Sequence, residues 1–307
     1  MTHFIEVSFI ALMLSSTYIL IAVGFTLFFG AINIVHFAHG DVAMLGAFVA
    51  IILYAAADAL GLIAGTPIWI WAPLLALAIA IATGGLGLLF ERAVIKPFRA
   101  SPMLITLVAT VALGIIIRES VRLFYPQGSN PQVFPNLFGE SGLRFGELYF
   151  RTGHLVMFGL SLLLIFAMIL LIWRTRIGLA IRAVSQNLEA ASLSGINPDI
   201  VIMITFFIGS ILAGVAGVLI GSYYSMIKFD VGLMYGIKGF SAAVVGGLGN
   251  FYGAILGGLT LGLIETFASA YVPEGMAYKD VYAFLIVIFF LVFKPSGILA
   301  EKQYEKV

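Results

Sequence analysis

One polar stretch separates two long apolar segments and decides how the chain folds; it reads Arg174-Thr-Arg-Ile-Gly-Leu-Ala-Ile-Arg-Ala-Val-Ser-Gln-Asn-Leu-Glu-Ala-Ala-Ser-Leu-Ser-Gly-Ile-Asn-Pro-Asp199. Apolar side chains recur in it every three or four residues, which is the spacing of one face of an α-helix. They are Ile177, Ile181, Val184 and Leu188. We therefore expect a short amphipathic helical element at a membrane surface, with its apolar face against the rest of the protein.

The same stretch has a second, polar face and clear end signals. The polar face follows helical spacing through Arg182, Gln186 and Glu189. Gly195 is a natural helix stop, because glycine adopts the left-handed conformation at a helix end without steric cost. Asn197 and Pro198 are typical of the cap and first residue of a following helix. Two interpretations stay open: an ordinary solvated loop helix, or a docking handle for a soluble partner.

The composition identifies lipid as the solvent of this chain. Of its 307 residues, 62% are hydrophobic and only 10% are charged, whereas soluble domains have roughly 25% charged residues. The net charge of +1 gives no electrostatic reason to expect a nucleic-acid partner. The chain has no cysteine, which excludes disulfides and thiolate metal sites. We predict an all-α polytopic membrane protein that forms a single domain over residues 1–307.

Long apolar runs predict the membrane-spanning helices, each of which needs about 20 residues. They lie at about 9–29, 42–62, a run that ends near 90, 103–117, 154–173, 200–223 and 281–293. The region 240–271 is expected to add an even number of crossings. The total is then about eight or nine spans.

Residues 30–41 interrupt the apolar pattern after the first span: Gly-Ala-Ile-Asn-Ile-Val-His-Phe-Ala-His-Gly-Asp. Polar groups at bilayer depth are costly and usually face a cavity or the protein interior. Here they are Asn33, His36, His39 and Asp41. Two histidines and one carboxylate are a weak basis for a metal site, and no metal is expected. Alternatively, these groups satisfy backbone freed by a broken helix.

Residues 240–258 form the second interruption: Phe-Ser-Ala-Ala-Val-Val-Gly-Gly-Leu-Gly-Asn-Phe-Tyr-Gly-Ala-Ile-Leu-Gly-Gly. We expect two half-helices, or two short spans that turn near Asn250. Small residues at every fourth position are typical of helix-packing seams. The seam glycines are Gly217 and Gly221 in the span before, and Gly249, Gly253 and Gly257 here. Glu265, an isolated carboxylate in an apolar run, could line a pathway or bond a neighbouring helix.

The distribution of basic residues predicts the topology. The loop 91–101, the insert 174–199 and the tail with Lys302 and Lys306 are basic and are assigned to the cytoplasm. No basic residue precedes the first span, so the N-terminus is assigned to the outside. Residues 125–151 are rich in Gly, Pro and Asn and are expected to form an external loop.

The remaining charged residues are expected at the ends of spans. We interpret one group as a solvated helix end after the fourth span: Arg118, Glu119 and Arg122. A second group is assigned to an external or re-entrant connection: Lys228, Asp230 and Lys238.

Motifs of enzymes and ATP-binding proteins are missing from the sequence. It has no G-x-x-x-x-G-K-[ST] phosphate loop, so it does not bind ATP in the Walker manner. It has no G-x-S-x-G or H-E-x-x-H motif either. Transport is therefore favoured over catalysis, and no cofactor is expected. Two alternatives stay open: an ion-coupled secondary carrier, and a membrane enzyme that uses His36, His39 and Asp41.

Several motifs resemble those of the LivH/LivM family, the permease subunits of bacterial ABC importers for branched-chain amino acids. They are His36-Phe-Ala-His-Gly-Asp41, Glu91-Arg92 with Pro97-Phe-Arg99, Gly178-Leu-Ala-Ile-Arg-Ala183 with Gly195-Ile-Asn197, Phe240-Ser-Ala-Ala-Val-Val-Gly-Gly-Leu-Gly249, and Lys294-Pro-Ser-Gly-Ile-Leu299. The resemblance covers nearly the whole chain. One departure concerns the first motif, where the family often has Asn at the place of His36.

The resemblance implies partners and a mechanism in the bacterial inner membrane. A periplasmic binding protein would deliver an aliphatic amino acid to this subunit, which would pair with a homologous permease or a copy of itself. Two cytoplasmic ATPases would engage the element 174–199. The residues expected to contact them are Arg176, Gly178, Arg182, Gln186, Glu189 and Gly195.

The resemblance also implies a translocation pathway. Its candidate residues are Asn33, His36, His39, Asp41, Asn250 and Glu265. Within the same family, urea, short amides or other amino acids are alternative cargo.

Overall fold

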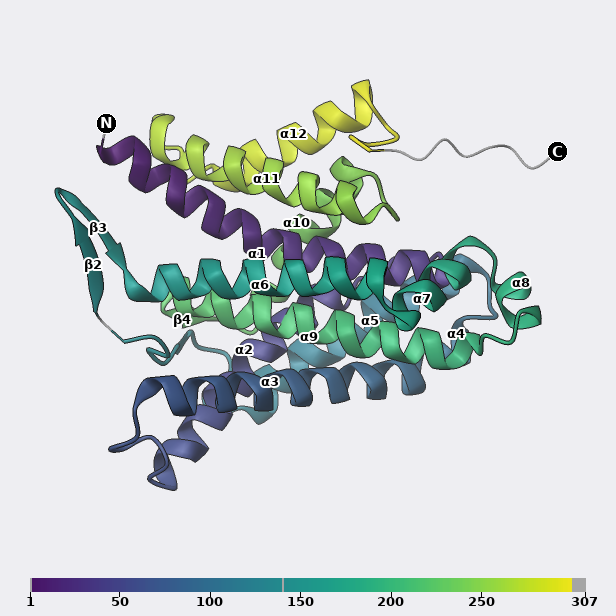
Figure 1. The fold of residues 1–307 in the computed structure, drawn as a ribbon, viewed down its shortest axis with the longest axis horizontal. Helices are drawn as coiled ribbons and strands as arrows, with labels where there is room; N and C mark the ends of the chain where they lie inside the picture. Colours follow the sequence, from purple (N-terminus) through teal and green to yellow (C-terminus); the bar gives the residue numbers. More distant parts are fainter. Residues whose placement is uncertain (1, 140, 300–307) are drawn as a thin grey trace.

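The computed structural model describes residues 2–139 and 141–299, which are mostly helical (Figure 1). The helices are α1 (Thr2–Ile32), α2 (His39–Ala59), α3 (Ile68–Phe90), the π-helix η1 (Glu91–Ile95), α4 (Lys96–Phe98), α5 (Met103–Phe124), α6 (Thr152–Arg174), α7 (Arg176–Gln186), α8 (Leu188–Leu193), α9 (Pro198–Tyr224), α10 (Val231–Gly246), α11 (Phe251–Tyr271) and α12 (Lys279–Phe293). The basic tail with Lys302 and Lys306 lies outside the described residues.

Seven helices in the described part of the chain are long and apolar enough to cross a membrane. They are α1, α2, α3, α5, α6, α9 and α11, and the α3 crossing continues through η1 and α4. The prediction of a polytopic all-α membrane protein is confirmed. The count of eight or nine spans stays a prediction, because α10 and α12 are shorter than a full crossing.

The two interruptions predicted from the sequence are present. The first lies between Ile32 and His39, where α1 ends and α2 begins. The second lies between Gly246 and Phe251, where α10 ends and α11 begins. At each break the chain adopts a positive φ, at Asn33 (52°) in the first and at Gly247 (109°) and Gly249 (90°) in the second. Glycine and asparagine accept this conformation more readily than other residues.

Helices α1 and α9 form the centre of the bundle. α1 contacts α11, α9, α10, α6 and α7, whereas α9 contacts α2 and α3 on its other side. Both central helices are apolar around their whole circumference, and such helices are stable only when other helices surround them. The outer helices α3, α5 and α6 instead expose many large apolar side chains, as expected for surfaces that face lipid.

The segment 125–151 contains strands that the sequence analysis did not predict. β1 (Gln132–Val133) pairs antiparallel with β4 (Met226–Ile227), and β2 (Gly142–Phe145) pairs with β3 (Leu148–Arg151). Phe145 lies opposite Leu148, so Gly146 and Glu147 form a two-residue turn. Gly146 has a φ of +63°, which a hairpin turn of this length favours at its first position.

Two other segments also differ from expectation. Residues 91–101 are not a loop, because the chain stays helical through η1 and α4 up to Phe98. The fourth span is longer than the predicted 103–117, because the apolar helix α5 continues through the predicted helix end to Phe124. Arg118 therefore lies two turns inside the helix.

Candidate functional site

The polar insert folds into two short helices joined at Asn187. Thr175 caps α7, with its Oγ1 accepting a hydrogen bond from the Gly178 N–H at 3.1 Å. Asn187 adopts an extended conformation, and its Oδ1 accepts from the Ala190 N–H at 2.9 Å to start α8. Asparagine favours such cap positions because its side chain replaces a missing backbone acceptor. The expected helical element is present, but it is divided.

The end signals of the insert act as expected. Gly195 has a φ of +82°. The Ile196 N–H donates to the Ala191 oxygen and the Gly195 N–H to the Ser192 oxygen, which satisfies the last carbonyls of α8. Asn197 then caps α9 by accepting from the N–H groups of its first turn, and Pro198 is the first helical residue.

The apolar face of α7 differs in part from the predicted stripe. Ile181 and Val184 are buried, but Ile177 and Leu188 are 43% and 49% exposed. Gly178 is buried together with Ile181 and Val184, because the start of α7 lies against the last carbonyls of α6. The docked face of α7 is therefore narrower than periodicity predicted, and apolar side chains remain on its outer surface.

The outer surface of α7 and α8 combines charged and apolar side chains. Arg176, Gln186 and Glu189 are exposed, and the Arg182 guanidinium lies over the Trp173 ring, 4.4 Å from its centroid. Leu193, at the end of α8, is 86% exposed. Both helices lie at one end of the bundle (Figure 1). Apolar side chains exposed beside charged ones are typical of a protein-binding surface.

An ion-pair cluster joins two segments that were predicted on the same side of the membrane. The Asp199 carboxylate, at the start of α9, contacts the Arg99 guanidinium and lies 3.1 Å from the Lys96 Nζ. Lys96 and Arg99 belong to α4 and the turn after it. The end of the α3 crossing and the end of the insert therefore meet at the same end of the bundle.

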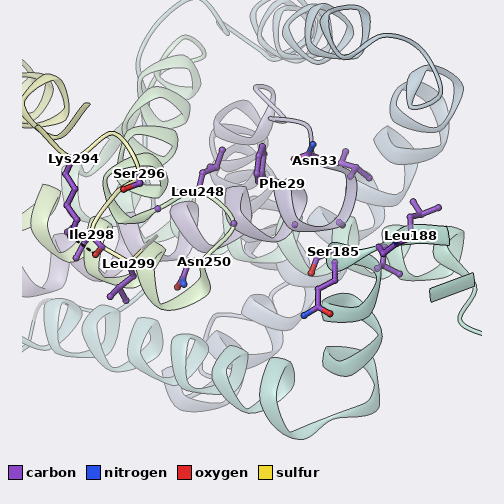
Figure 2. Close-up of a pocket in the computed structure, with 18 residues that line it drawn as sticks. Phe29, Asn33, Ser185, Leu188, Leu248, Asn250, Lys294, Ser296, Ile298 and Leu299 are labelled. Atoms are coloured by element: carbon purple, nitrogen blue, oxygen red, sulfur yellow. Dashed lines mark hydrogen bonds between the residues drawn. The ribbon is translucent and has the colours of Figure 1, made fainter. Parts of the chain in front are cut away.

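A cavity of about 1130 Å³ opens at this same end (Figure 2). Four segments line it: residues 29–33 at the end of α1, residues 184–188 at the α7–α8 junction, residues 247–250 between α10 and α11, and residues 294–299 after α12. Both helix breaks and the amphipathic insert therefore share one cavity. Two of the predicted pathway residues, Asn33 and Asn250, line the cavity. Gln186, which was predicted to contact the ATPases, lines it as well.

The segment after α12 holds the second break in place. The N–H groups of Ile298 and Leu299 donate to the oxygens of Val245 and Gly246 at 2.8 and 3.0 Å. Both carbonyls lie in the last turn of α10, where no N–H group of the same helix can donate to them. On the other side of the break, the Asn250 Oδ1 accepts from the Gly253 N–H at 2.8 Å and caps α11. The second break is thus hydrogen-bonded on both of its sides.

His36 and His39 do not line this cavity but pack inside the first break. Both are fully buried. The His39 ring lies edge-on to Phe25 and Phe28, and its Nε2 is 3.2 Å from the Ile21 oxygen. Among the described residues, no group of three or more potential ligands could hold a metal ion.

Asp41 pairs with a residue that the sequence analysis placed in solvent. Its Oδ1 lies 3.5 Å from the Nε of Arg118, and both side chains are largely buried. The interpretation of Arg118 as solvated is wrong, since its side chain is largely buried beside Asp41. Glu119 and Arg122, which pair with each other at 2.5 Å, remain partly exposed as expected.

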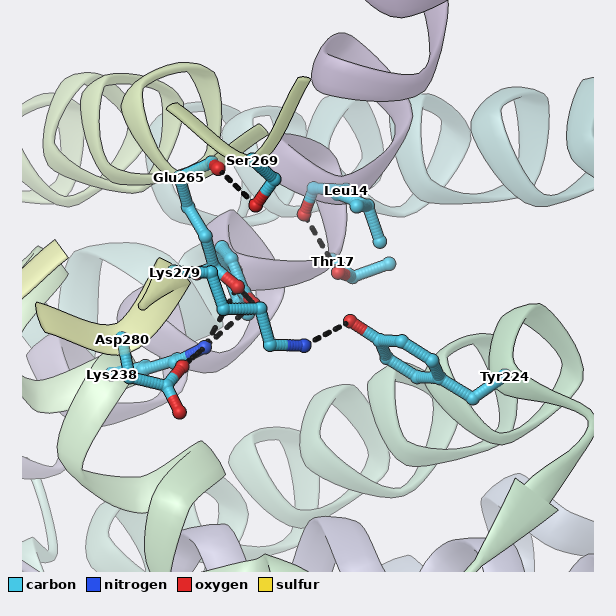
Figure 3. Close-up of polar contacts among 9 residues, drawn as sticks. Leu14, Thr17, Tyr224, Lys238, Glu265, Ser269, Lys279 and Asp280 are labelled. Atoms are coloured by element: carbon cyan, nitrogen blue, oxygen red, sulfur yellow. Dashed lines mark hydrogen bonds and ion pairs between the residues drawn. The ribbon is translucent and has the colours of Figure 1, made fainter. Parts of the chain in front are cut away.

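Glu265 belongs to a charge cluster formed by residues of α1, α10, α11 and α12 (Figure 3). The Lys238 Nζ lies 2.8 Å from the Glu265 Oε1 and 2.6 Å from the Asp280 Oδ1. The Tyr18 hydroxyl donates to the Glu265 Oε1 at 3.1 Å. Lys238 was assigned to an external or re-entrant connection; the structure places it, buried, within the short helix α10, which excludes the external alternative. Of the two interpretations of Glu265, the structure places it in a bond between helices.

The predicted seam glycines divide into two kinds. A Cβ at Gly217 would overlap the Ala43 oxygen of α2, and one at Gly257 would overlap the Ala242 oxygen of α10. Gly253 similarly contacts Gly246, and Gly221 faces the Phe134 ring. Gly249 differs: it lies in the second break with a φ of +90°, so it serves a turn and not a helix seam.

The fold and the site together define a multi-pass membrane transport protein, because interrupted helices around a cavity are typical of that class. The family described as branched-chain amino acid transport system, permease component, matches residues 8–291. The chain belongs to this family.

Individual relatives match over almost the whole chain. It is 37% identical over 309 residues to the high-affinity branched-chain amino acid transport system permease protein LivH of Escherichia coli, covering 99% of this chain and 98% of that protein. The corresponding protein BraD of Pseudomonas aeruginosa is also 37% identical, over 311 residues with the same coverage. A probable LivH permease of Methanocaldococcus jannaschii is 27% identical over 306 residues, covering 94% and 90%. No solved structure matches the chain significantly.

Proposed function

We propose that this permease carries branched-chain aliphatic amino acids inward across the bacterial inner membrane, driven by ATPase subunits that bind the α7–α8 element. The observation that carries the proposal is the cavity that this element shares with both helix breaks. Any force applied to α7 and α8 from outside the bundle acts directly on the wall of that cavity. The absence of a phosphate loop in the sequence requires that ATP be bound by another chain.

The proposed topology places the α7–α8 end in the cytoplasm. Six basic residues lie in the two segments that meet at Asp199 at this end: Arg92, Lys96, Arg99, Arg174, Arg176 and Arg182. Basic residues near short connections favour the cytoplasmic side. The opposite end, with the β2–β3 hairpin and the N-terminus, then faces the periplasm (Figure 1).

The proposed partners follow from this orientation. Two ATPases would dock on the exposed charged and apolar side chains of α7 and α8, a periplasmic binding protein would deliver cargo at the opposite end, and a homologous permease or a second copy would complete the pathway. The separation of the two ends by the full length of the bundle matches the separate sites that these soluble partners need.

The proposed mechanism uses the contacts of α7. Ile181 and Val184 pack into the bundle while Ser185 to Leu188 line the cavity, so closure of the ATPases would shift α7 against α1 and α9. The facing walls are the two breaks, where short unwound segments can change conformation without disrupting a long helix. The cavity would thereby open and close toward the cytoplasm.

Reconstitution tests the proposal. The permease is purified with its ATPases and incorporated into proteoliposomes, and uptake of labelled leucine is measured with the binding protein present. We expect uptake that needs both ATP and the binding protein. Uptake driven by a proton or sodium gradient without ATPase subunits would instead identify an ion-coupled carrier and contradict the proposal. Parallel assays with urea, short amides and other amino acids decide the cargo within the family.

A further inference from the structure

The outer helix α5 differs from α3 and α6 because it is charged within its membrane crossing. α3 has no Asp, Glu, Lys or Arg, and α6 has only Arg174, its last residue. α5 has three such residues before its end at Phe124: Arg118, Glu119 and Arg122. Charged side chains within a crossing are costly in hydrocarbon and usually face protein or water. The surroundings of α5 must therefore differ from those of α3 and α6.

Arg118 lies deep in the membrane, because its ion-pair partner Asp41 does. Asp41 is in the first turn of α2, and His39 in the same turn places its Nε2 3.2 Å from the Ile21 oxygen, inside α1 and away from both ends of that helix. The Arg118 side chain is 17% exposed, and its Nε lies 3.5 Å from the Asp41 Oδ1. A guanidinium has five N–H donors, which one carboxylate cannot satisfy. Lipid tails offer no acceptor for the others.

The first helix break lies against the same side of α5. The Phe37 N–H donates to the Thr110 Oγ1 of α5 at 3.2 Å. The Phe37 ring also contacts the Phe240 ring of α10, with 5.6 Å between the centroids. Phe37 is partly exposed, so unwound backbone reaches the surface of the bundle between α5 and α10. Such backbone is stable at membrane depth only beside protein or water, so lipid alone does not cover this face.

Water alone does not cover the face either, because large apolar side chains lie on it. α10 exposes Leu233 and Met234, at 51% and 37%. On α5, four apolar side chains that are 39–71% exposed alternate at intervals of four and three residues, and Arg118 and Arg122 continue the same stripe: Leu104, Val108, Val111 and Ile115. This alternation is the pattern by which one helix packs along another. A protein surface inside the membrane fits both the apolar stripe and the charges.

The charges on this face balance one another. Asp41 and Glu119 are acidic, and Arg118 and Arg122 are basic, so the four sum to zero. Glu119 and Arg122 are 39% and 43% exposed and are accessible to a neighbour. A subunit with the same fold presents the same mixture of charges. A twofold arrangement can then set Glu119 of one subunit beside the corresponding arginine of the other.

We propose that a second permease subunit of this family packs on the face formed by α5, the first break and the start of α10. The proposal rests on the proposed function, which requires a second permease, and it assigns that subunit a surface. The soluble partners do not reach membrane depth, so a membrane subunit is the occupant that fits. Arg118 then lies at the junction of two subunits, where its other donors find acceptors. The opposite edge of α5 still faces lipid, with Ile105, Ile116 and Leu123 exposed.

Photo-cross-linking of the purified complex, with its ATPases and binding protein in lipid nanodiscs, tests this surface. p-Benzoylphenylalanine replaces Val111 or Ile115 on α5. Phe166 on α6 is the matched control position, since it is 57% exposed in the middle of another outer helix. We expect α5 to give an adduct of two permease subunits, identified by mass, and Phe166 to give none. A permease adduct from Phe166 alone, or α5 adducts with only lipid, an ATPase or the binding protein, would overturn the proposal.

A substitution that enlarges a side chain without adding charge provides a second measurement. Ile115→Trp is acceptable to lipid but overpacks a helix pair. We expect it to lower the ratio of paired to single permease subunits, measured by native mass spectrometry, at least threefold. Phe166→Trp should leave that ratio unchanged. The same ratio in both variants would contradict the assignment of α5 to the pairing surface.

Uptake measurements separate this inference from the proposed function, because ATP-driven leucine uptake by the wild-type complex does not depend on which surface pairs the subunits. If uptake needs ATP but the permease adduct forms from Phe166 and not from α5, the surface is wrong and the function is supported. If the α5 adduct forms but uptake does not need ATP, the surface is supported and the function is wrong.

Discussion

The geometry of the buried Lys238–Glu265 pair predicts which of its two residues costs more stability when it is replaced. Lys238 has two carboxylate partners, Glu265 at 2.8 Å and Asp280 at 2.6 Å. Glu265 has one cation, Lys238, and one hydroxyl, that of Tyr18. Asp280 is 37% exposed and can be hydrated when it loses Lys238, whereas Glu265 cannot.

Removal of either partner leaves a buried charge, which typically costs about 3–5 kcal/mol. We expect Lys238→Met to reach the upper part of that range, because Glu265 would keep only the Tyr18 hydroxyl. Glu265→Leu should cost about 3 kcal/mol or less, because Lys238 retains Asp280. The double variant should lie within about 1 kcal/mol of the wild type, since apolar replacements of similar volume leave no buried charge.

Unfolding in mixed micelles, with SDS as the denaturant, measures these differences, and thermal unfolding in nanodiscs provides a second measurement. Lys279→Met is the control: it removes a hydrogen bond and a cation–π contact to Tyr224 at the same helix end, and should cost only about 1 kcal/mol. Additive losses in the double variant, or a larger loss for Glu265→Leu than for Lys238→Met, would refute the assignment of the cluster as a helix-joining pair.

Three further predictions concern the coupling element and the packing. Arg182→Glu, or Ala183→Pro in the middle of α7, should leave the subunit inserted but uncouple ATP hydrolysis from uptake; fully coupled transport in both variants would count against α7 as the docking element. Gly257→Ala should lower stability by about 1–3 kcal/mol because its Cβ overlaps the Ala242 oxygen, whereas Gly159→Ala, which meets open space, should not; equal thermal shifts would contradict the close packing of α10 and α11. Asp199→Ala should change the free energy of unfolding by about 1 kcal/mol or less, because its partners are partly exposed, and the effect should shrink at high salt; a large, salt-independent loss would be inconsistent with a surface cluster.

The sequence contained enough local information to predict the elements but not their long-range pairs. The breaks at 33–38 and 247–250 were predictable, since glycine, asparagine and histidine interrupt apolar runs there. The cap at Asn197 and the helix start at Pro198 were predictable because these residue types favour those two positions. The hairpin turn at Gly146 was not predicted, although a glycine between two short apolar runs is a signal for such a turn.

The ion pairs could not be assigned from periodicity. Lys238 and Glu265 lie 27 residues apart on different helices, and Asp41 and Arg118 are still farther apart in the chain. A lone charge inside an apolar segment indicates that a partner must exist, because its burial in lipid is costly. It does not say which helix supplies the partner. That choice depends on how α2, α5, α10 and α11 pack.

The shared cavity was unpredictable for a related reason. Asn33, Gln186, Asn250 and Ser296 belong to four separate segments. They come together because α7 and α11 both pack against α1 and because the segment after α12 is hydrogen-bonded to the end of α10. The exposure of Leu188 was also missed, because the helix is divided at Asn187 and Leu188 begins α8.

The most direct test of the account uses a single cysteine at Leu193, the exposed end of α8, in a chain that has no other cysteine. In intact cells, a membrane-impermeant thiol reagent should leave Leu193→Cys unlabelled. In inside-out vesicles the same residue should cross-link to the ATPase subunit, with a yield that changes between nucleotide states. Labelling of this cysteine from the periplasm, or a transport-active complex in which no ATPase can be cross-linked to it, would contradict the account.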